Sequence, residues 1–407
     1  MREELNRRET VVLEGHIVDS LILPKVLDLI LEAGAEYEVV ELDMGRTTLD
    51  PSLAHIRVFT ADDDAMEALL EQLHVHGANR LHDEDASMAV ADQDGVLPVG
   101  FYSTTNLPTG VRIDGVWVPV DNPEMDCAIV VGPDGARTAP MHHVRTGDKV
   151  VVGGKGVRVQ PLPQAPAGSA FEFMASDVSS EKPKALLVAK VAEQMRAARQ
   201  TGGRVLTVAG PAVVHTGGSR HLARLVRDGW IDVLFAGNGL ATHDVESNVL
   251  GTSLGVSVAH GAPTEGGHSN HVRVINEIRR HGSIAQAVDA GYLRGGVMYE
   301  CIQRDVPFVL AGSVRDDGPL PDTITDVVEA ADAMRALVPG VTVALMLATT
   351  LHAIATGNML PAGVVTFCVD INQAVVTKLA DRGSHQAMGI VTDVGPFLGD
   401  LAEELGA

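Results

Sequence analysis

Three apolar runs near the end of the chain decide the fold: Val341-Thr-Val-Ala-Leu-Met346, Val364-Val-Thr-Phe-Cys-Val369 and Ala387-Met-Gly-Ile-Val-Thr392. Polar or hydroxyl-bearing residues follow each run and lead into a helical pattern. Apolar runs of this length that alternate with helices predict a parallel sheet whose two faces are both covered. In such sheets, ligands bind where the strands end and helix N-termini begin. We therefore expect the active site at the carboxyl ends of these strands.

Asp370 directly follows the second run. In a dinucleotide fold, a carboxylate at a strand end accepts hydrogen bonds from both ribose hydroxyls and repels the extra phosphate of NADP. The alternative is that Asp370 only caps the next helix, which we expect over residues 371–379. Both interpretations stay open from the sequence.

Composition places the 407-residue chain among globular proteins, with 45% hydrophobic and 21% charged residues. A net charge of −22 argues against nucleic acid and anionic membranes as partners. The charged N-terminal sequence and the lack of a long apolar run favour a cytoplasmic protein. The three cysteines are widely spaced and indicate neither a disulfide framework nor a zinc motif.

The periodicity changes twice along the chain, which predicts three parts. Residues 1–87 have the order strand, helix, strand, strand, helix of a ferredoxin-like α+β module, with a further strand expected to close it. Residues 88–167 carry short alternating segments, including a hairpin around Asp114-Gly115, and end in a proline-rich linker over 160–167. Residues 168–407 are predicted to form a Rossmann-like, doubly wound α/β domain with at least six strands.

Gly237-Asn238-Gly239 follows a predicted strand and resembles the first half of a dinucleotide fingerprint. Thr242 stands where the third glycine belongs, so the signal is weak and a tight turn is an alternative. No GxxxxGK[ST] motif occurs, which excludes a P-loop.

Two other loops could carry chemistry. His268 and His271 have a spacing that suits a metal, but no HExxH or CxxC motif accompanies them, so we predict no metal site. Arg315-Asp316-Asp317-Gly318 follows a predicted strand, where an arginine can hold a substrate carboxylate and the acidic residues an ammonium group. A solvated, self-paired loop is the alternative. Glu300 lies on the helix before that strand.

Five motifs stand out: Phe101-Tyr-Ser-Thr-Thr-Asn106, Glu124-Met-Asp-Cys127, Ala236-Gly-Asn-Gly-Leu-Ala-Thr-His-Asp244, Tyr299-Glu-Cys301 and Val309-Leu-Ala-Gly-Ser-Val-Arg-Asp-Asp-Gly-Pro-Leu-Pro-Asp322. Together they resemble the archaeal-type, NAD-dependent ornithine cyclodeaminases and the C-terminal part of cyanobacterial arginine dihydrolase/ornithine cyclodeaminases. The N-terminal part is similar to the conserved domain of the lysine-oxoglutarate reductase/saccharopine dehydrogenase. The arginine-dihydrolase domain has no counterpart in this sequence.

The resemblance implies a lyase in which NAD takes a hydride from Cα of ornithine and returns it after ring closure and loss of ammonia, giving proline. It also implies, together with the loop positions, two sets of site residues. The catalytic set is Glu300, Arg315 and Asp317, and the cofactor-binding set is Asn238, Gly239, Leu240, Asp316, Thr349, Leu351, His352, Asp370, Asp393 and Val394. Ornithine is the expected small-molecule partner, and we expect a homo-oligomer.

Two rival functions stay open. A saccharopine-type dehydrogenase or reductase would exchange NAD(H) with solution and show net redox chemistry. A non-catalytic amino-acid sensor would bind its ligand in the N-terminal module, with the α/β part as a scaffold filled by the cofactor. The charged loops favour an enzyme over a sensor.

Overall fold

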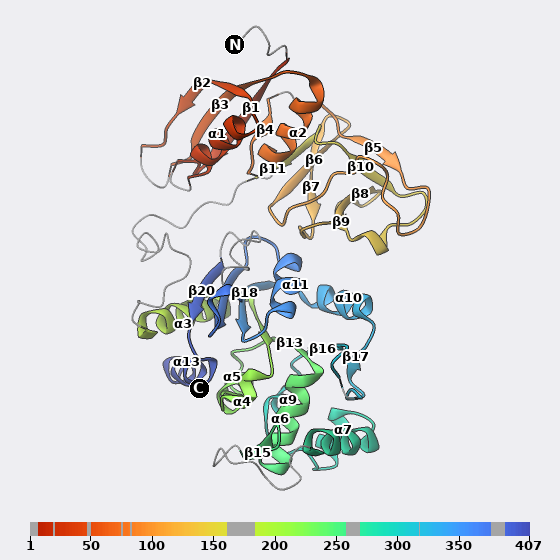
Figure 1. Cartoon of the computed structure of the whole chain (residues 1–407), viewed down its shortest axis with the longest axis vertical. Coiled ribbons are helices and arrows are strands. Elements are labelled where there is room, and N and C mark those ends of the chain that lie inside the picture. Colours follow the sequence, from red (N-terminus) through yellow and green to blue (C-terminus); the bar gives the residue numbers. More distant parts are fainter. Residues whose placement is uncertain are drawn as a thin grey trace. The chain divides into compact units, whose positions relative to one another are not determined.

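The computed structural model describes residues 7–18, 21–46, 50–74, 76–81, 84–160, 184–257, 269–316, 318–375 and 387–407 (Figure 1). The chain divides into two compact units. One contains residues 1–175 with 358–363, and the other contains residues 176–357 with 364–407. None of the described helices is long and apolar enough to cross a membrane.

The first unit begins with a four-stranded antiparallel sheet in the order β2-β3-β1-β4. Its elements are β1 (Arg7–Gly15), α1 (Ile22–Glu32), β2 (Glu36–Asp43), β3 (Ser52–Thr60), α2 (Asp63–His74) and β4 (Asn79–Arg80). Buried and half-buried residues alternate along the whole of β3, so one face of the sheet packs on a core shared with α1 and α2. The expected ferredoxin-like order and its closing strand are confirmed.

The rest of the first unit is β-rich. A seven-stranded sheet has the order β11-β6-β7-β9-β8-β10-β5. Its strands are β5 (Ser87–Val90), β6 (Thr109–Ile113), β7 (Val116–Asp121), β8 (Ala128–Gly132), β9 (Gly135–Ala139), β10 (Lys149–Val152) and β11 (Val157–Val159). Asp114 and Gly115, with φ of 50° and 79°, make the expected tight turn between β6 and β7.

The second unit contains a seven-stranded parallel sheet in the order β17-β16-β13-β12-β18-β19-β20. Its strands are β12 (Arg204–Ala209), β13 (Val233–Gly237), β16 (Phe308–Ala311), β17 (Thr323–Ile324), β18 (Val341–Leu347), β19 (Val365–Asp370) and β20 (Ala387–Val391). Nearly every residue of β12, β13, β18 and β19 is buried, which is why these strands read as continuous apolar runs. The predicted Rossmann-like sheet is confirmed.

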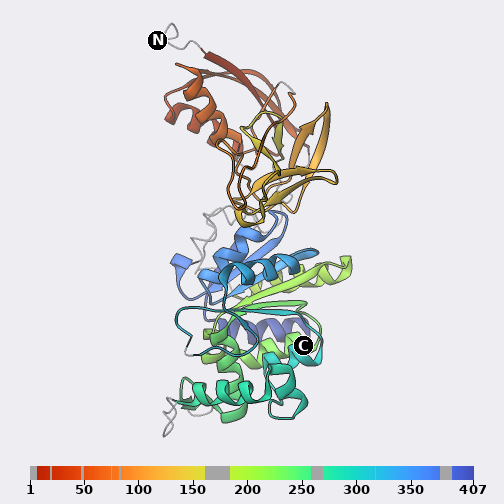
Figure 2. The same ribbon diagram turned by 90° about the vertical axis from the view of Figure 1, so that its right-hand side faces the viewer.

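Helices lie on both sides of this sheet, and Figure 2 shows α10 and α11 (blue) on one side and α5 and α6 (green) on the other. The helices are α3 (Lys184–Thr201), α4 (Ala212–His215), α5 (Ser219–Arg227), α6 (Asn238–Leu250), α7 (Asn270–His281), α8 (Ile284–Asp289), α9 (Val297–Gln303), α10 (Val327–Leu337), α11 (Leu351–Met359) and α13 (Val394–Leu405). A short hairpin, β14 (Thr252–Ser253) with β15 (Val256–Ser257), follows α6.

Residues 236–244, expected as a loop, are the end of β13 and the start of α6, because the helix begins at Asn238 directly after the strand. The C-terminal helix begins at Val394, because Asp393 caps it by accepting a hydrogen bond from the Gly395 amide. Residues 161–167 of the expected linker, the boundary at 168 and residues 376–379 of the helix expected over 371–379 lie outside the described residues. The division at residue 87 stays a prediction.

Candidate functional site

The strand order locates the crevice of the second unit. From β12 the chain proceeds to β13 and β16 on one side, and from its neighbour β18 it proceeds to β19 and β20 on the other. The order therefore reverses between β12 and β18, and ligands of doubly wound sheets bind outside the carboxyl ends of the strands at such a point. The loops meet closely there, because a Cβ on Gly210 would lie 2.0 Å from the Ala348 carbonyl oxygen. Ala348 itself has φ of 48°, a strained conformation of a kind that is common at ligand sites.

His352 links the loops of the two halves. It lies in the first turn of α11, and a Cβ on Gly237 at the end of β13 would lie 3.0 Å from its Cε1 atom. Burial lowers the pKa of His352, while the nearby Asp316 carboxylate opposes this shift. The structure thus brings His352, Gly237 and Asp316 together, and the imidazole is neutral near pH 7.

The loop after β18 suits an anionic group. Thr349 is half-buried, and α11 starts at Leu351. The first amides of a nine-residue helix have no partner within the helix, and the helix dipole favours negative charge there. Leu351 is 80% exposed although it follows a buried strand, so it offers apolar surface beside that charge.

Asp370 ends β19 and is only 9% exposed. Its Oδ1 atom accepts a hydrogen bond of 2.8 Å from the Asn372 amide, so the carboxylate stabilises a turn with one oxygen. Ile371, the next residue, is 76% exposed. Asp393 ends its loop as the cap of α13, and Val394 is buried, so Val394 can meet a cofactor only through its backbone.

Asn238, Gly239 and Leu240 form the first turn of α6. The Asn238 side-chain oxygen accepts hydrogen bonds from the Leu320 amide at 2.9 Å and from the Thr323 hydroxyl at 3.3 Å. That leaves the Nδ2 group of Asn238 as its donor toward a ligand. Leu240 is fully buried, so its backbone is the part that a cofactor can approach.

Arg315 and Asp316 follow β16 at the same edge of the sheet. Arg315 is exposed, and the Asp316 carboxylate accepts a hydrogen bond of 2.8 Å from the Ser313 amide, which shapes the turn. Asp317 lies outside the described residues. The structure therefore places Asp316 at the crevice, close to His352, and leaves the Arg315 guanidinium on the surface of this loop.

Glu300 is not brought to this edge. It lies in α9, and the charges that act on it belong to Arg227 and Asp228, where α5 ends just before β13 begins. That is the opposite end of the strands from the crevice. Burial raises the pKa of the Glu300 carboxyl, and Arg227 and Arg304 oppose the shift. Because of this separation, Glu300 does not enter our proposal for the acid or base.

A cluster of histidines near the crevice was missed from the sequence. His215 comes at the end of α4, the first helix after β12, and its Nδ1 atom lies 2.7 Å from the Ser253 hydroxyl. The His243 ring lies 4.8 Å from that of His215, and its Nδ1 atom lies 2.9 Å from the fully buried Glu246 carboxylate. The members come from α4, α6 and β14, so no local spacing could reveal them. His271 extends the cluster at a ring distance of 6.4 Å from His243, whereas His260 and His268 lie outside the described residues.

Models of known protein families match nearly the whole chain. Residues 189–401 match the C-terminal Rossmann-fold region of ArgZ-like arginine dihydrolases, and residues 108–188 match the first region of that C-terminal part. Residues 8–107 match the conserved region of the LOR/SDH bifunctional enzyme. The three matches together span nearly all of both units.

Individual relatives agree with these matches. A Methanopyrus kandleri protein named ornithine cyclodeaminase is 52% identical over 404 residues, which is 98% of each chain. The apo structure of the cyanobacterial arginine dihydrolase ArgZ has a TM-score of 0.85 and 39% identity over 98% of this chain and 58% of its own. A ternary complex of AgrE with ornithine and NAD+ has a TM-score of 0.54 and 43% identity over 98% of this chain and 57% of its own. The resemblance found in the motifs is thereby confirmed, and the chain belongs to the ornithine cyclodeaminase family that includes the C-terminal region of ArgZ-like arginine dihydrolases.

Proposed function

We propose that this protein converts L-ornithine to L-proline and ammonia with NAD that is recycled in each turnover. The observation that carries the proposal is the 52% identity over 98% of the chain to an archaeal ornithine cyclodeaminase. The carboxyl edge of the parallel sheet supports it, because a close loop crossing, a helix N-terminus and a buried carboxylate lie there. A homo-oligomeric state and a cytoplasmic location stay predictions.

The cofactor residues divide between two halves of the sheet, and each half has the strand–helix–strand plan of a mononucleotide-binding unit. Of the second strands of the two halves, β13 ends on Gly237 and β19 ends on the acidic Asp370. We therefore assign the adenosine ribose to Asp370 and the pyrophosphate to the loop of Thr349 and the start of α11. The nicotinamide then belongs to the half with β12, β13 and β16, beside Asn238, Gly239 and Asp316.

The reacting end of ornithine needs a group that binds its carboxylate and groups that move protons. When bound, NAD supplies an acceptor for the Cα hydride and returns it after ring closure. Arg315, on the loop after β16, is the candidate for the carboxylate, with Asp317 for an ammonium group. Burial and the His243 ring lower the pKa of His215, so this imidazole is neutral near pH 7 and can accept a proton.

Nitrogen labelling tests the proposed reaction directly. Ornithine with heavy nitrogen at the α position should give labelled ammonia and unlabelled proline, because the δ nitrogen closes the ring and displaces the α nitrogen. Ornithine labelled at the δ position should keep its label in proline. Mass spectrometry of both products, with the protein and no added oxidant, measures the distribution.

The same assay separates the rival functions. Net formation of NADH in proportion to the ornithine consumed would contradict the proposal and favour a dehydrogenase. Binding of an amino acid with no proline under any condition would favour a sensor. An α label that appears in proline would show that another nitrogen leaves.

Replacing Asp370 by alanine should weaken NAD binding by about 1–3 kcal/mol, the scale of hydrogen bonds to a charged group. The preference for NAD over NADP should also narrow, because the carboxylate no longer repels the additional phosphate. Calorimetric titration of the full chain measures both. Asp326→Ala is the matched control, because Asp326 caps α10 through the Val328 and Glu329 amides and ends no strand of this sheet. Equal NAD affinities of Asp370→Ala and the unmodified chain would show that Asp370 only stabilises a turn and does not bind the cofactor.

A further inference from the structure

The first unit contains a cavity that the proposed reaction does not use. It has a volume of about 220 Å³, and its walls come from α2, from β4 and from the two segments around residues 101–103 and 153–154. A space of about 150 Å³ in a protein core accommodates benzene, so a compound of amino-acid size fits. None of its lining residues belongs to the unit that carries the parallel sheet.

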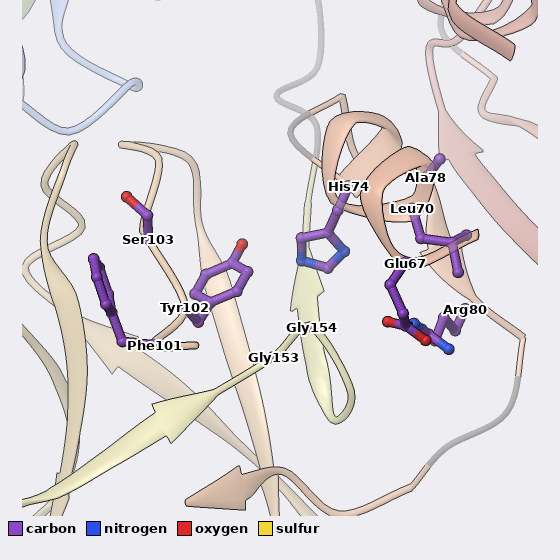
Figure 3. A pocket seen from close by; sticks show the side chains of 10 residues that line it. All are labelled: Glu67, Leu70, His74, Ala78, Arg80, Phe101, Tyr102, Ser103, Gly153 and Gly154. Atoms are coloured by element: carbon purple, nitrogen blue, oxygen red, sulfur yellow. The ribbon is translucent and has the colours of Figure 1, made fainter. Parts of the chain in front are cut away.

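One stripe of α2 faces this cavity. Glu67, Leu70 and His74 are spaced three and four residues apart, which places them on the same side of the helix. The ring of His74 points from the end of α2 toward Tyr102, and Glu67 lies at the side near Arg80 (Figure 3). Two polar residues thus occupy positions where a helix packed only on a core would carry apolar ones.

His74 is buried with an unused nitrogen. It is only 6% exposed, and among the residues that the structure describes no hydrogen-bond partner lies within reach of its Nε2 atom. The ring meets that of Tyr102 edge to face at 5.5 Å. A buried polar atom without a partner is costly, so such an atom at the wall of a cavity indicates a ligand that completes it.

The groups around this nitrogen are hydrogen-bond donors. Burial raises the pKa of the Tyr102 hydroxyl and lowers the pKa of His74 to about 4, and the Arg80 guanidinium lowers the latter further. Near pH 7 the phenol therefore keeps its proton, and the imidazole is neutral, so that its Nε2 atom can donate a hydrogen bond in the Nε2–H tautomer. The Ser103 hydroxyl and the Arg80 guanidinium add donors to the same lining, and donors of this kind suit a carboxylate.

The mouth of the cavity carries a carboxylate, whereas its interior carries hydrogen-bond donors. Glu67 is 53% exposed on its side chain and forms an ion pair with Arg80, which also lies 3.6 Å from the Glu9 carboxylate. Two carboxylates thus share one guanidinium, and the partly exposed Glu67 carboxylate is open to an ammonium group. Leu70, Ala78 and Phe101 supply the apolar part of the lining.

We propose that this cavity binds a free amino acid, with its carboxylate at His74, Tyr102 and Arg80, its ammonium group at Glu67, and its side chain against Leu70, Ala78 and Phe101. The proposal does not rest on the function proposed for the parallel sheet. It gives the protein a second, non-catalytic amino-acid site on its N-terminal unit.

The test uses the full chain with histidine labelled in its ring. Each of the twenty common amino acids is titrated while the His74 ring signals are followed by nuclear magnetic resonance, and valine and proline are compared with valinamide and prolinamide. At least one amino acid should shift the His74 signals in a saturable way. The amides should bind about tenfold or more weakly, because they lack the charge that the donors stabilise.

Matched variants locate the binding site, and their affinities are measured by calorimetric titration because His74→Phe has no His74 ring signal. His74→Phe and Tyr102→Phe keep the ring contact but remove the nitrogen or the hydroxyl, and each should weaken binding about tenfold. His281→Phe and Tyr292→Phe alter a similar ring pair, 5.3 Å apart in the other unit, and should leave binding unchanged. Glu67→Gln, on an exposed position that tolerates substitution, should weaken amino acids but not the corresponding acids without an amino group. The proposal is overturned if no amino acid shifts His74, if amides bind as tightly as acids, or if His74→Phe and His281→Phe bind equally well.

Discussion

Replacing Asp244 by alanine is expected to lower the free energy of unfolding of the C-terminal unit by about 3–5 kcal/mol, because several buried donors lose their only carboxylate. Asp244 is fully buried in α6. Its Oδ1 atom accepts a hydrogen bond of 2.6 Å from the Ser219 hydroxyl, and its Oδ2 atom accepts one of 2.9 Å from the Met298 amide. One side chain therefore joins α6 to the first turns of α5 and α9.

The start of α9 explains why the loss is large. Gly296, the residue that precedes α9, has no side chain that could cap the first amides of this helix, and its φ is 100°. A Cβ on Gly296 would lie 2.6 Å from the Asp244 Oδ2 atom, so the glycine allows the carboxylate to reach the Val297 and Met298 amides. Burial raises the pKa of Asp244, and the hydrogen bonds from the Ser219 hydroxyl and the Met298 and Val297 amides oppose the shift. Without the carboxylate the donors remain buried and unsatisfied.

The two tryptophans allow the measurement to be confined to one unit. With Trp117 replaced by phenylalanine, Trp230 is the remaining tryptophan and reports the C-terminal unit during urea unfolding. Asp326→Ala in the same background removes an exposed helix cap and should cost only about 1 kcal/mol. A loss for Asp244→Ala no larger than that of Asp326→Ala would show that water replaces the carboxylate.

Asp244 also shows what kind of information a local motif contains. It closes the segment Ala236 to Asp244, which marks the family and was interpreted as a ligand loop. The structure assigns its two ends different tasks: Gly237 lies against His352 in the crevice, whereas Asp244 holds two other helices in place. Both uses require a fixed residue at a fixed position, so the sequence alone could not separate them.

The parallel sheet could be predicted because its strands are buried on both faces, which leaves a continuous apolar run in the sequence. Two-residue strands such as β17 were missed, since so short a segment carries no periodicity. The histidine cluster could not be predicted, because His215 and Ser253 meet only through the packing of α4 against the end of α6. Strand ends are visible in a sequence, and contacts between loops are not.

Glu300 illustrates a further limit. Its place before β16 made it adjacent in sequence to the Arg315 loop, but a helix that precedes a parallel strand runs back toward the amino end of the sheet. The charges that act on it are those of Arg227, Arg304 and Asp228. Direction along a crossover, rather than distance in sequence, therefore decides which residues can share a site.

Lowering the pH from about 6.5 to 4 should cost the N-terminal unit about 3 kcal/mol of unfolding free energy through His74 alone, as linkage requires for such a shift in pKa. Burial lowers the pKa of His74 from 6.5 to about 4 in the folded chain, with a smaller contribution from Arg80. Between these values only the unfolded chain binds a proton at this position. Acid therefore favours unfolding across that window, and above pH 6.5 the contribution of His74 to stability is constant.

A difference measurement isolates His74 from the other histidines. With Trp230 replaced by phenylalanine, Trp117 reports the N-terminal unit, and the unmodified His74 is compared with His74→Phe at pH 7 and pH 4.5. On going to the lower pH the unmodified chain should lose about 2–3 kcal/mol of unfolding free energy more than His74→Phe loses, since phenylalanine binds no proton. Parallel pH profiles, or a ring-proton titration of His74 with a midpoint at or above about 6, would mean that the imidazole is hydrated rather than held dry beside Tyr102.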